Sequence, residues 1–204
     1  MLYMPYMDHN SLIISKEVDA YLKRKPYVQE AIEKEIVNYS ALSRKIAKDI
    51  GEVSFEAVKS ALIRNSKQII RDKKEREKKV IKLLNQANFY IMNKIATIHH
   101  NSPIDIESIA NSKTPSGCMY FTKENIALKS KYKKIEYGFA IIHIKNPKEI
   151  EETPGVTAFL LSTLASENIN IYHIMDCRED TFLVIKEYEA PLAFETLAKS
   201  LKIS

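Results

Sequence analysis

Glycine, cysteine and long apolar runs are all scarce in this chain of 204 residues. Only two cysteines are present, Cys118 and Cys177, which are too few for a disulfide framework and too far apart for a zinc knuckle. The best apolar stretch, residues 139–144, falls far short of the roughly 18 residues that a membrane span needs. Residues 1–10 lack the basic and then apolar pattern of a signal peptide. We therefore expect a cytoplasmic protein with no membrane partner.

Motifs for catalysis and metal binding are missing as well. With only four glycines, the chain has no Gly-rich phosphate loop, and it has no nucleophile–base or paired-carboxylate motif. His99 and His100 are neighbours in a strand-like segment, where successive side chains point to opposite faces, so they cannot both bind one ion. We expect a protein that is not an enzyme and has no metal site and no cofactor.

The positive charge is concentrated in the first part of the chain. Residues 1–80 carry 17 Lys and Arg against 12 Asp and Glu, whereas residues 81–204 carry 14 of each. This asymmetry indicates either an anionic partner for the basic part or a well-solvated helical surface.

The spacing of apolar residues changes from a helical to a strand-like period near residues 80–88. The change predicts an α+β protein with a helical domain at residues 1–80, a strand-contributing segment at 81–136 and a C-terminal domain at 137–204. The mixed-sign run at residues 71–79 is typical of an exposed linker helix, which we expect to continue toward Leu84.

Three helices are expected before that linker. The first covers residues 26–37, the second follows Ser40 as its N-cap and ends at Gly51, and the third begins at Ser54. Two helices joined by a tight Gly-containing turn at residues 51–53, with another packed on them, give a helix-turn-helix-like layout. In that layout the helix after the turn enters the major groove of DNA.

Cationic and polar residues follow one side of the third helix and could contact DNA phosphates and base edges. The alternative is a helical interaction or dimerisation module, and the sequence leaves both open. The candidate nucleic-acid-binding residues are Arg44, Lys45, Lys59, Ser60, Arg64, Lys67 and Arg71.

The last third of the chain reads as strand, helix, strand, strand, helix. The strands are expected at residues 137–145, 169–176 and 181–186, and the helices at 156–167 and 190–201. That order belongs to the ferredoxin-like group, an antiparallel sheet with helices on one face. Only three strands are present where the fold needs four, so the fourth must come from the middle segment or from another chain.

Specific residues in this third carry a resemblance to a known family. Thr153-Pro154-Gly155-Val156 stands at the strand-to-helix junction, Ile169-Asn170-Ile171 follows the helix, and Ala190-Pro191-Leu192 opens the last helix. Because of these residues, positions 137–201 resemble the regulatory ACT domains of aspartokinases. With its helical N-terminal part, the whole chain is similar to archaeal ACT-containing proteins of unassigned function. The catalytic motifs of aspartokinases are absent.

The junction at Gly155 is where the resemblance implies a binding site. Free backbone N–H groups at a helix start attract a carboxylate, and ACT domains of this type bind amino acids there, with a strand edge of a neighbouring domain completing the site. Asp176 departs from related chains, which often carry a small hydroxyl, and a carboxylate there favours an amino group or a cation. The alternative is a tight helix entry with an empty site. The candidate ligand-binding residues are Thr153, Pro154, Gly155, Val156, Asn170, Ile171 and Asp176.

The middle segment is expected to contain strands at residues 89–99, 117–121 and 125–129, forming a second, degenerate ACT-like unit. Our leading hypothesis is a homodimeric regulator in which the ACT domain senses an amino acid and the helical domain binds DNA. The alternatives are a regulatory subunit of an amino-acid biosynthetic enzyme and a dimerisation module without a ligand.

Overall fold

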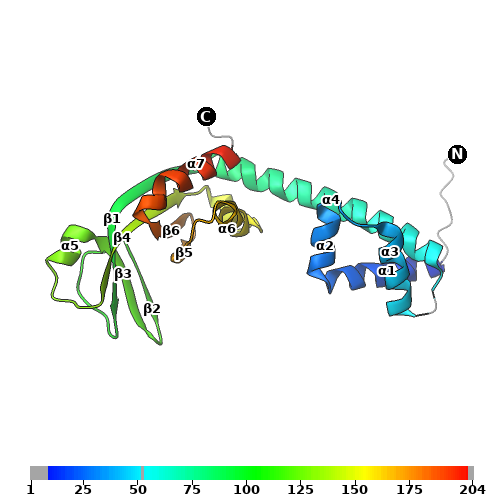
Figure 1. The fold of residues 1–204 in the computed structure, drawn as a ribbon, viewed down its shortest axis with the longest axis horizontal. Helices are drawn as coiled ribbons and strands as arrows, with labels where there is room; N and C mark the ends of the chain where they lie inside the picture. The colour runs from blue at the N-terminus through cyan, green and yellow to red at the C-terminus, as the bar shows by residue number, and fades with distance from the viewer. Residues whose placement is uncertain (1–8, 52, 202–204) are drawn as a thin grey trace. The chain divides into compact units, whose positions relative to one another are not determined.

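The computed structural model describes residues 9–51 and 53–201, with side chains from Leu12 onward (Figure 1). Residues 1–8, most of the segment considered above as a possible signal peptide, lie outside these described residues. Glu52 of the predicted turn also lies outside them. The chain divides into two compact units, Met1–Glu77 and Lys78–Ser204. In the described part, no helix is both long and apolar enough to cross a membrane.

The first unit is helical. It contains α1 (His9–Lys23), α2 (Pro26–Glu33), α3 (Tyr39–Ile50) and the beginning of α4 (Phe55–Leu84). α4 is continuous to Leu84, which confirms the linker helix, whereas α2 ends four residues before the predicted position 37. α1 was not predicted, although its Val18 and Leu22 recur at i and i+4 and are fully buried. The buried core of the unit consists of Val18, Tyr21, Leu22, Ile32, Ile46, Val58, Ala61 and Leu62.

The start of α3 differs from the prediction. Its N-cap is Asn38, whose Oδ1 accepts a hydrogen bond of 3.0 Å from the backbone N–H of Ala41. The predicted cap, Ser40, therefore lies inside the first turn, because Asn38 caps at least as well and stands two residues earlier. Gly51 ends the helix as predicted, with a positive φ of 111°.

The second unit is built on one antiparallel sheet of six strands. They are β1 (Asn88–His100), β2 (Ala110–Thr114), β3 (Gly117–Lys123), β4 (Ile135–Lys145), β5 (His173–Cys177) and β6 (Asp180–Lys186), in the order β2-β3-β1-β4-β6-β5. Helices α6 (Val156–Ser166) and α7 (Ala190–Leu201) and the short turns η1 (Lys148–Ile150) and η2 (Glu187–Glu189) complete the C-terminal third. The order β4-α6-β5-β6-α7 confirms the predicted ferredoxin-like, ACT-like topology.

The fourth strand comes from the middle segment of the same chain. β1 pairs with β4 from Asn88↔Lys145 to Ile98↔Ile135, on the side of β4 opposite β6. The strand predicted at residues 125–129 is wrong, because this stretch forms the short helix α5 (Glu124–Leu128) and buries only Ala127. A short apolar run does not distinguish a strand from a helical turn by its period.

β5 is also shorter than predicted. The backbone N–H of Ile169 bonds to Leu164 O of α6, and the first bond of the segment to β6 is Tyr172 N to Val184 O. Residues 169–171 therefore belong to the helix exit rather than to the sheet. Asn168 has a positive φ of 58°, which is where the chain turns away from α6.

Two cores lie on the two faces of the sheet. Ala140, Ile142 and Ile144 of β4 pack with α6 and α7, whereas Phe139 and Ile141 pack on the other face. β4 therefore reads as a continuous apolar run, since it is covered on both sides.

α7 presents one face of mixed small and large apolar residues to the core. Leu197 and Leu201 are buried, whereas Leu192 and Phe194 are 45% and 41% exposed. Ala190 and Ala193 complete the buried face, because residues 190, 193, 197 and 201 share one side of a helix.

The cap of α3 gives a stability test. We expect Asn38→Ala to lower the free energy of unfolding of the helical unit by about 1 kcal/mol, because the Ala41 amide loses its acceptor. Ser40→Ala is the matched control and should change it by less than about 0.5 kcal/mol. Chemical denaturation measures both, and a larger loss for Ser40→Ala would contradict the assignment.

Candidate functional site

The segment before α6 turns sharply at Gly155. Its φ of 97° and ψ of −5° lie in the left-handed region, which glycine adopts without strain. A Cβ at this position would meet no atom within 4 Å, so backbone conformation rather than crowding favours glycine here. The Gly155 carbonyl accepts the first bond of the helix, from Phe159 N at 2.9 Å.

The first amides of α6 have no partner among the described residues. No side chain caps the helix, and no acceptor is found for the N–H groups of Val156, Thr157 and Ala158. Thr153 does not cap the helix, since its buried hydroxyl donates a hydrogen bond of 2.9 Å to the preceding Glu149 O. The positive end of the helix dipole is thus open to a ligand.

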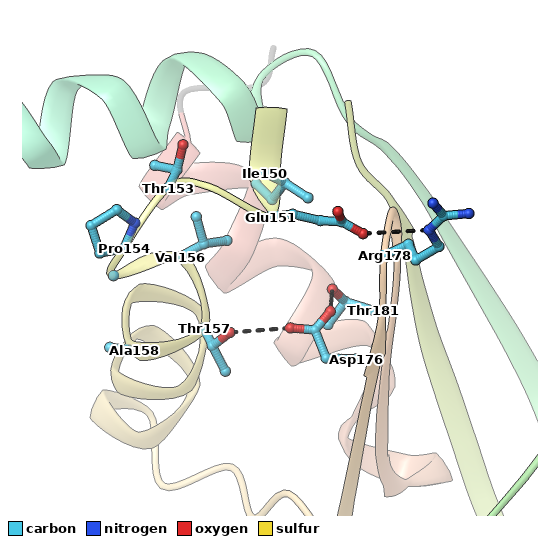
Figure 2. A pocket seen from close by; sticks show the side chains of 11 residues that line it. Ile150, Glu151, Thr153, Pro154, Val156, Thr157, Ala158, Asp176, Arg178 and Thr181 are labelled. Atoms are coloured by element: carbon cyan, nitrogen blue, oxygen red, sulfur yellow. Dashed lines mark hydrogen bonds and ion pairs between the residues drawn. The ribbon is translucent and has the colours of Figure 1, made fainter. Parts of the chain in front are cut away.

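These amides border a crevice of about 430 Å³ (Figure 2). That volume is within the range of small-molecule sites in proteins. The crevice lies between the start of α6 and the β5–β6 hairpin. Its lining residues are Ile150, Glu151, Thr153, Pro154, Gly155, Val156, Thr157, Ala158, Asp176, Arg178 and Thr181.

Asp176 of β5 places a carboxylate in this crevice. Its Oδ1 accepts a hydrogen bond of 2.9 Å from Thr181 Oγ1, and its Oδ2 lies 3.4 Å from the Thr157 hydroxyl at the helix start (Figure 2). Thr181 in turn accepts a bond of 3.1 Å from Nδ2 of the buried Asn146. The carboxylate is therefore oriented by a chain of polar contacts that begins in the core.

Arg178 and Glu151 add one charge of each sign. Arg178 Nε lies 3.7 Å from Glu151 Oε1, and their side chains are 86% and 49% exposed. An ion pair so exposed contributes little to stability. It leaves both groups free to turn toward a ligand.

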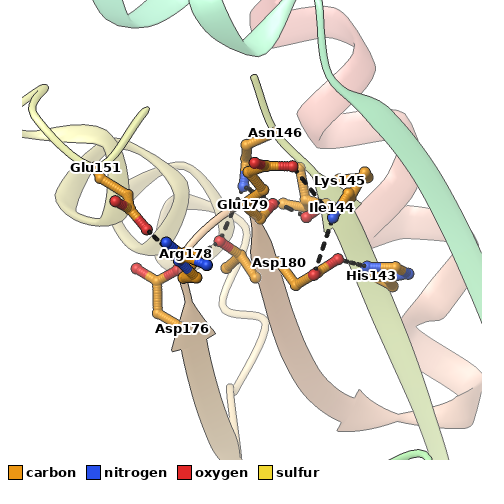
Figure 3. Close-up of polar contacts among 10 residues, drawn as sticks. His143, Ile144, Lys145, Asn146, Glu151, Asp176, Arg178, Glu179 and Asp180 are labelled. Atoms are coloured by element: carbon orange, nitrogen blue, oxygen red, sulfur yellow. Dashed lines mark hydrogen bonds and ion pairs between the residues drawn. The ribbon is translucent and has the colours of Figure 1, made fainter. Parts of the chain in front are cut away.

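The β5–β6 hairpin is tied to β4 by a second set of contacts (Figure 3). His143 Nε2 lies 2.7 Å from Asp180 Oδ1, and Lys145 Nζ donates to Asp180 Oδ2 at 3.0 Å. The hydrogen bond with His143, followed by that with Lys145, lowers the pKa of Asp180 below its ordinary value. The Asn146 amide also donates to Glu179 O at 3.1 Å. The hairpin that carries Asp176 and Arg178 is thus fixed to the sheet.

The predicted site residues fall into two groups. Thr153, Pro154, Gly155, Val156 and Asp176 line the same crevice. Asn170 is exposed outside it, and Ile171 packs against the core between the sheet and the helices, because β5 begins only after them. Sequence reasoning missed Thr157, which lies in α6 itself. It also missed Arg178 and Thr181, which the β5–β6 pairing brings near α6.

Most of the candidate cationic residues of the helical unit are exposed along α3 and α4, whereas Lys59 is half-buried. Ser60, Arg64, Lys67 and Arg71 share one face of α4, and no described residue forms an ion pair with Arg64 or Lys67. The remaining candidates are Arg44, which is exposed, Lys45, which lies 3.8 Å from Asp49, and Lys59, which lies over the Phe55 ring at 5.7 Å. Around the described side chains, no group of three or more His, Cys, Asp or Glu could hold a metal ion.

Comparison with known proteins gives a family match in the C-terminal part of the chain. Residues 134–199 match the family model of the ACT domain. No curated protein matches the sequence. Among solved structures, a Vibrio cholerae protein of unknown function, described as a possible transport protein, is 18% identical and has a TM-score of 0.52, over 62% of this chain and 98% of its own. This similarity shows a shared fold.

Two aspartate kinase structures are more weakly similar. The regulatory subunit from Thermus thermophilus is 14% identical, with a TM-score of 0.44 over 55% of this chain and 95% of its own. The enzyme from Clostridium acetobutylicum is 10% identical, with a TM-score of 0.45 over 56% of this chain and 34% of its own.

The hairpin contacts predict a dependence of stability on pH. Because folding lowers the pKa of Asp180, its carboxylate stabilises the fold above the ordinary pKa of about 3.9, and this contribution is lost as pH falls through the lower folded value. We therefore expect Asp180→Asn to lower the melting temperature at pH 7 and to differ less from wild type as the solution becomes more acidic. A difference that stays constant from pH 7 to about pH 3 would contradict this.

Proposed function

We propose that this chain is a non-catalytic regulatory protein that senses an amino acid through the crevice at the start of α6. The observation that carries the proposal is the set of unpaired α6 amides facing Asp176 across that crevice. An α-amino acid has a carboxylate suited to the amides and an ammonium group suited to the aspartate. The match of residues 134–199 to the ACT domain supports the same site.

The charges of the crevice favour some amino acids over others. Asp176 repels an additional carboxylate, whereas Glu151 and Arg178 compensate each other. A neutral or basic side chain therefore fits better than an acidic one. We expect aspartate and glutamate to bind most weakly.

Regulation requires that the ligand favour one arrangement of the protein over another. A second copy of the chain, pairing through the sheet unit and completing the crevice with a strand edge, would supply such an arrangement. The regulated partner would then be either DNA or an amino-acid biosynthetic enzyme. If no amino acid binds, the remaining alternative is that the chain is a dimerisation module without a ligand.

A thermal-shift screen of the twenty amino acids tests the sensor. A ligand at about 100 times its Kd should add about 2.7 kcal/mol to the free energy of unfolding. Asp176→Asn should abolish most of this shift, because it removes the charge that pairs with the ammonium group yet keeps an acceptor for Thr181. Glu167→Gln, an exposed acid at the other end of α6, is the matched control and should respond like wild type.

If no amino acid raises the melting temperature, the sensor proposal fails. If one does so equally in wild type and Asp176→Asn, a ligand binds but not in this crevice.

Duplex DNA is a second candidate partner, favoured by the exposed face of α4 that carries Ser60, Arg64, Lys67 and Arg71. A line of cations at helical spacing suits the phosphates of a groove. Arg44 on α3 adds a further exposed cation. This candidate is independent of the crevice, since all its residues lie in the helical unit.

The salt dependence of duplex binding tests this face. We expect Arg64→Ala with Lys67→Ala to weaken binding at least about tenfold and to reduce the slope of log K against log salt by about 2. Lys78→Ala with Lys79→Ala removes the same charge from exposed positions of the same helix and should have much less effect. Equal losses in the two variants would show an effect of net charge and would contradict a docking face.

A further inference from the structure

The loop between α5 and β4 carries an unusual density of positive charge. This lysine loop, residues 129–134, contains Lys129, Lys131, Lys133 and Lys134. All four side chains are exposed, and none forms an ion pair with a residue that the structure describes. Residues 81–204 have no net charge, so the loop is not part of a generally basic surface.

The backbone of the lysine loop is held at three points. At its start, Ser130 donates from both its N–H and its hydroxyl to Ala127 O, at 3.0 and 2.7 Å. At its end, Lys134 O accepts the N–H of His99 at 3.0 Å. Between them, Tyr132 packs against the apolar cluster of Ala96, Ile98, Cys118, Tyr120 and Ala127.

Four like charges within six residues repel one another, and no acid of the described chain lies within ion-pair distance of them. Asp105 lines a cavity together with Lys129 and Lys131, and Glu136 follows the loop, but neither forms an ion pair with a loop lysine. Anchoring the backbone keeps the charges together at the surface. Such an arrangement attracts a polyanion.

A cavity of about 380 Å³ adjoins these lysines. The Tyr132 ring and the His100 ring meet edge to face there, with centroids 5.6 Å apart. His100 is fixed by a contact of 2.8 Å between its Nδ1 and Ser102 O. The lining residues are His99, His100, Asn101, Lys131, Tyr132, Lys133 and Lys134.

The chemistry of this surface favours a ligand with several linked phosphates over a single phosphate group. A site for one phosphate usually offers a nest of backbone N–H groups or an arginine fork, and the lysine loop contains neither glycine nor arginine. Successive lysines instead suit successive phosphates. Aromatic rings beside a cationic track are the means by which proteins hold single-stranded nucleic acid, with bases stacked and phosphates neutralised.

We propose that the lysine loop is a binding site for single-stranded nucleic acid, in which a base enters the cavity beside Tyr132 and His100 and the phosphodiester backbone follows Lys131, Lys133 and Lys134. The site belongs to the sheet unit and shares no residue with the α6 crevice or the α4 face. It can therefore be tested independently of the effector and of duplex binding.

Fluorescence polarisation with labelled oligo(dT) of about 16 nucleotides tests the proposal on the full chain. We expect the triple variant Lys131→Gln, Lys133→Gln, Lys134→Gln to weaken binding at low salt at least about tenfold and to reduce the salt slope by about 2. The matched control, Lys82→Gln, Lys113→Gln, Lys148→Gln, removes the same charge from scattered exposed positions and should change affinity by less than about twofold.

Lysine acetylation of the wild-type chain gives a second, local measurement. Oligo(dT) should protect Lys131, Lys133 and Lys134 from acetylation and leave Lys113 and Lys148 reactive. Equal losses of affinity in the two triple variants, uniform protection of all lysines, or no binding by the wild-type chain at low salt would each overturn the proposal.

Discussion

The α6 crevice depends on two features of the backbone: the left-handed turn at Gly155 and the pairing of β5 with β6. The turn starts α6 without a side-chain cap, which leaves its first amides unpaired among the described residues. The register Asp176↔Thr181 then places the Asp176 carboxylate where the Thr181 hydroxyl holds it and where it faces those amides. A partial positive charge and a full negative charge are thereby fixed on opposite sides of one small space.

This arrangement is built on β4, a deeply buried strand of the second unit. β4 is covered by apolar side chains on both faces and paired on both edges, with β1 on one side and β6 on the other. The buried Asn146 follows β4 directly and bonds to both Thr181 and Glu179. Because the polar chain that ends at Asp176 starts from this scaffold, a ligand does not have to order the carboxylate when it binds, which reduces the cost of binding.

Local patterns in the sequence predict much of this architecture. The apolar run of β4, the Thr153-Pro154-Gly155-Val156 junction and the helix at Ala190–Leu201 are each identified by neighbouring residues. Asn170 and Ile171 lie outside the crevice of the single chain, because the point where the chain leaves α6 and joins β6 depends on long-range pairing. Arg178 and Thr181 were missed for the same reason, since their relation to α6 is set by the hairpin register. The division of the chain into three segments and the roles of the site residues stay predictions.

The most direct test of the central claim is an NMR titration of the backbone amides with the amino acid that gives the largest thermal shift. Our account predicts that the N–H resonances of Val156, Thr157 and Ala158 move most, because the ligand carboxylate accepts hydrogen bonds from them. If these three resonances remain in place while others shift at saturation, the amides at the start of α6 do not bind the ligand and the account is contradicted.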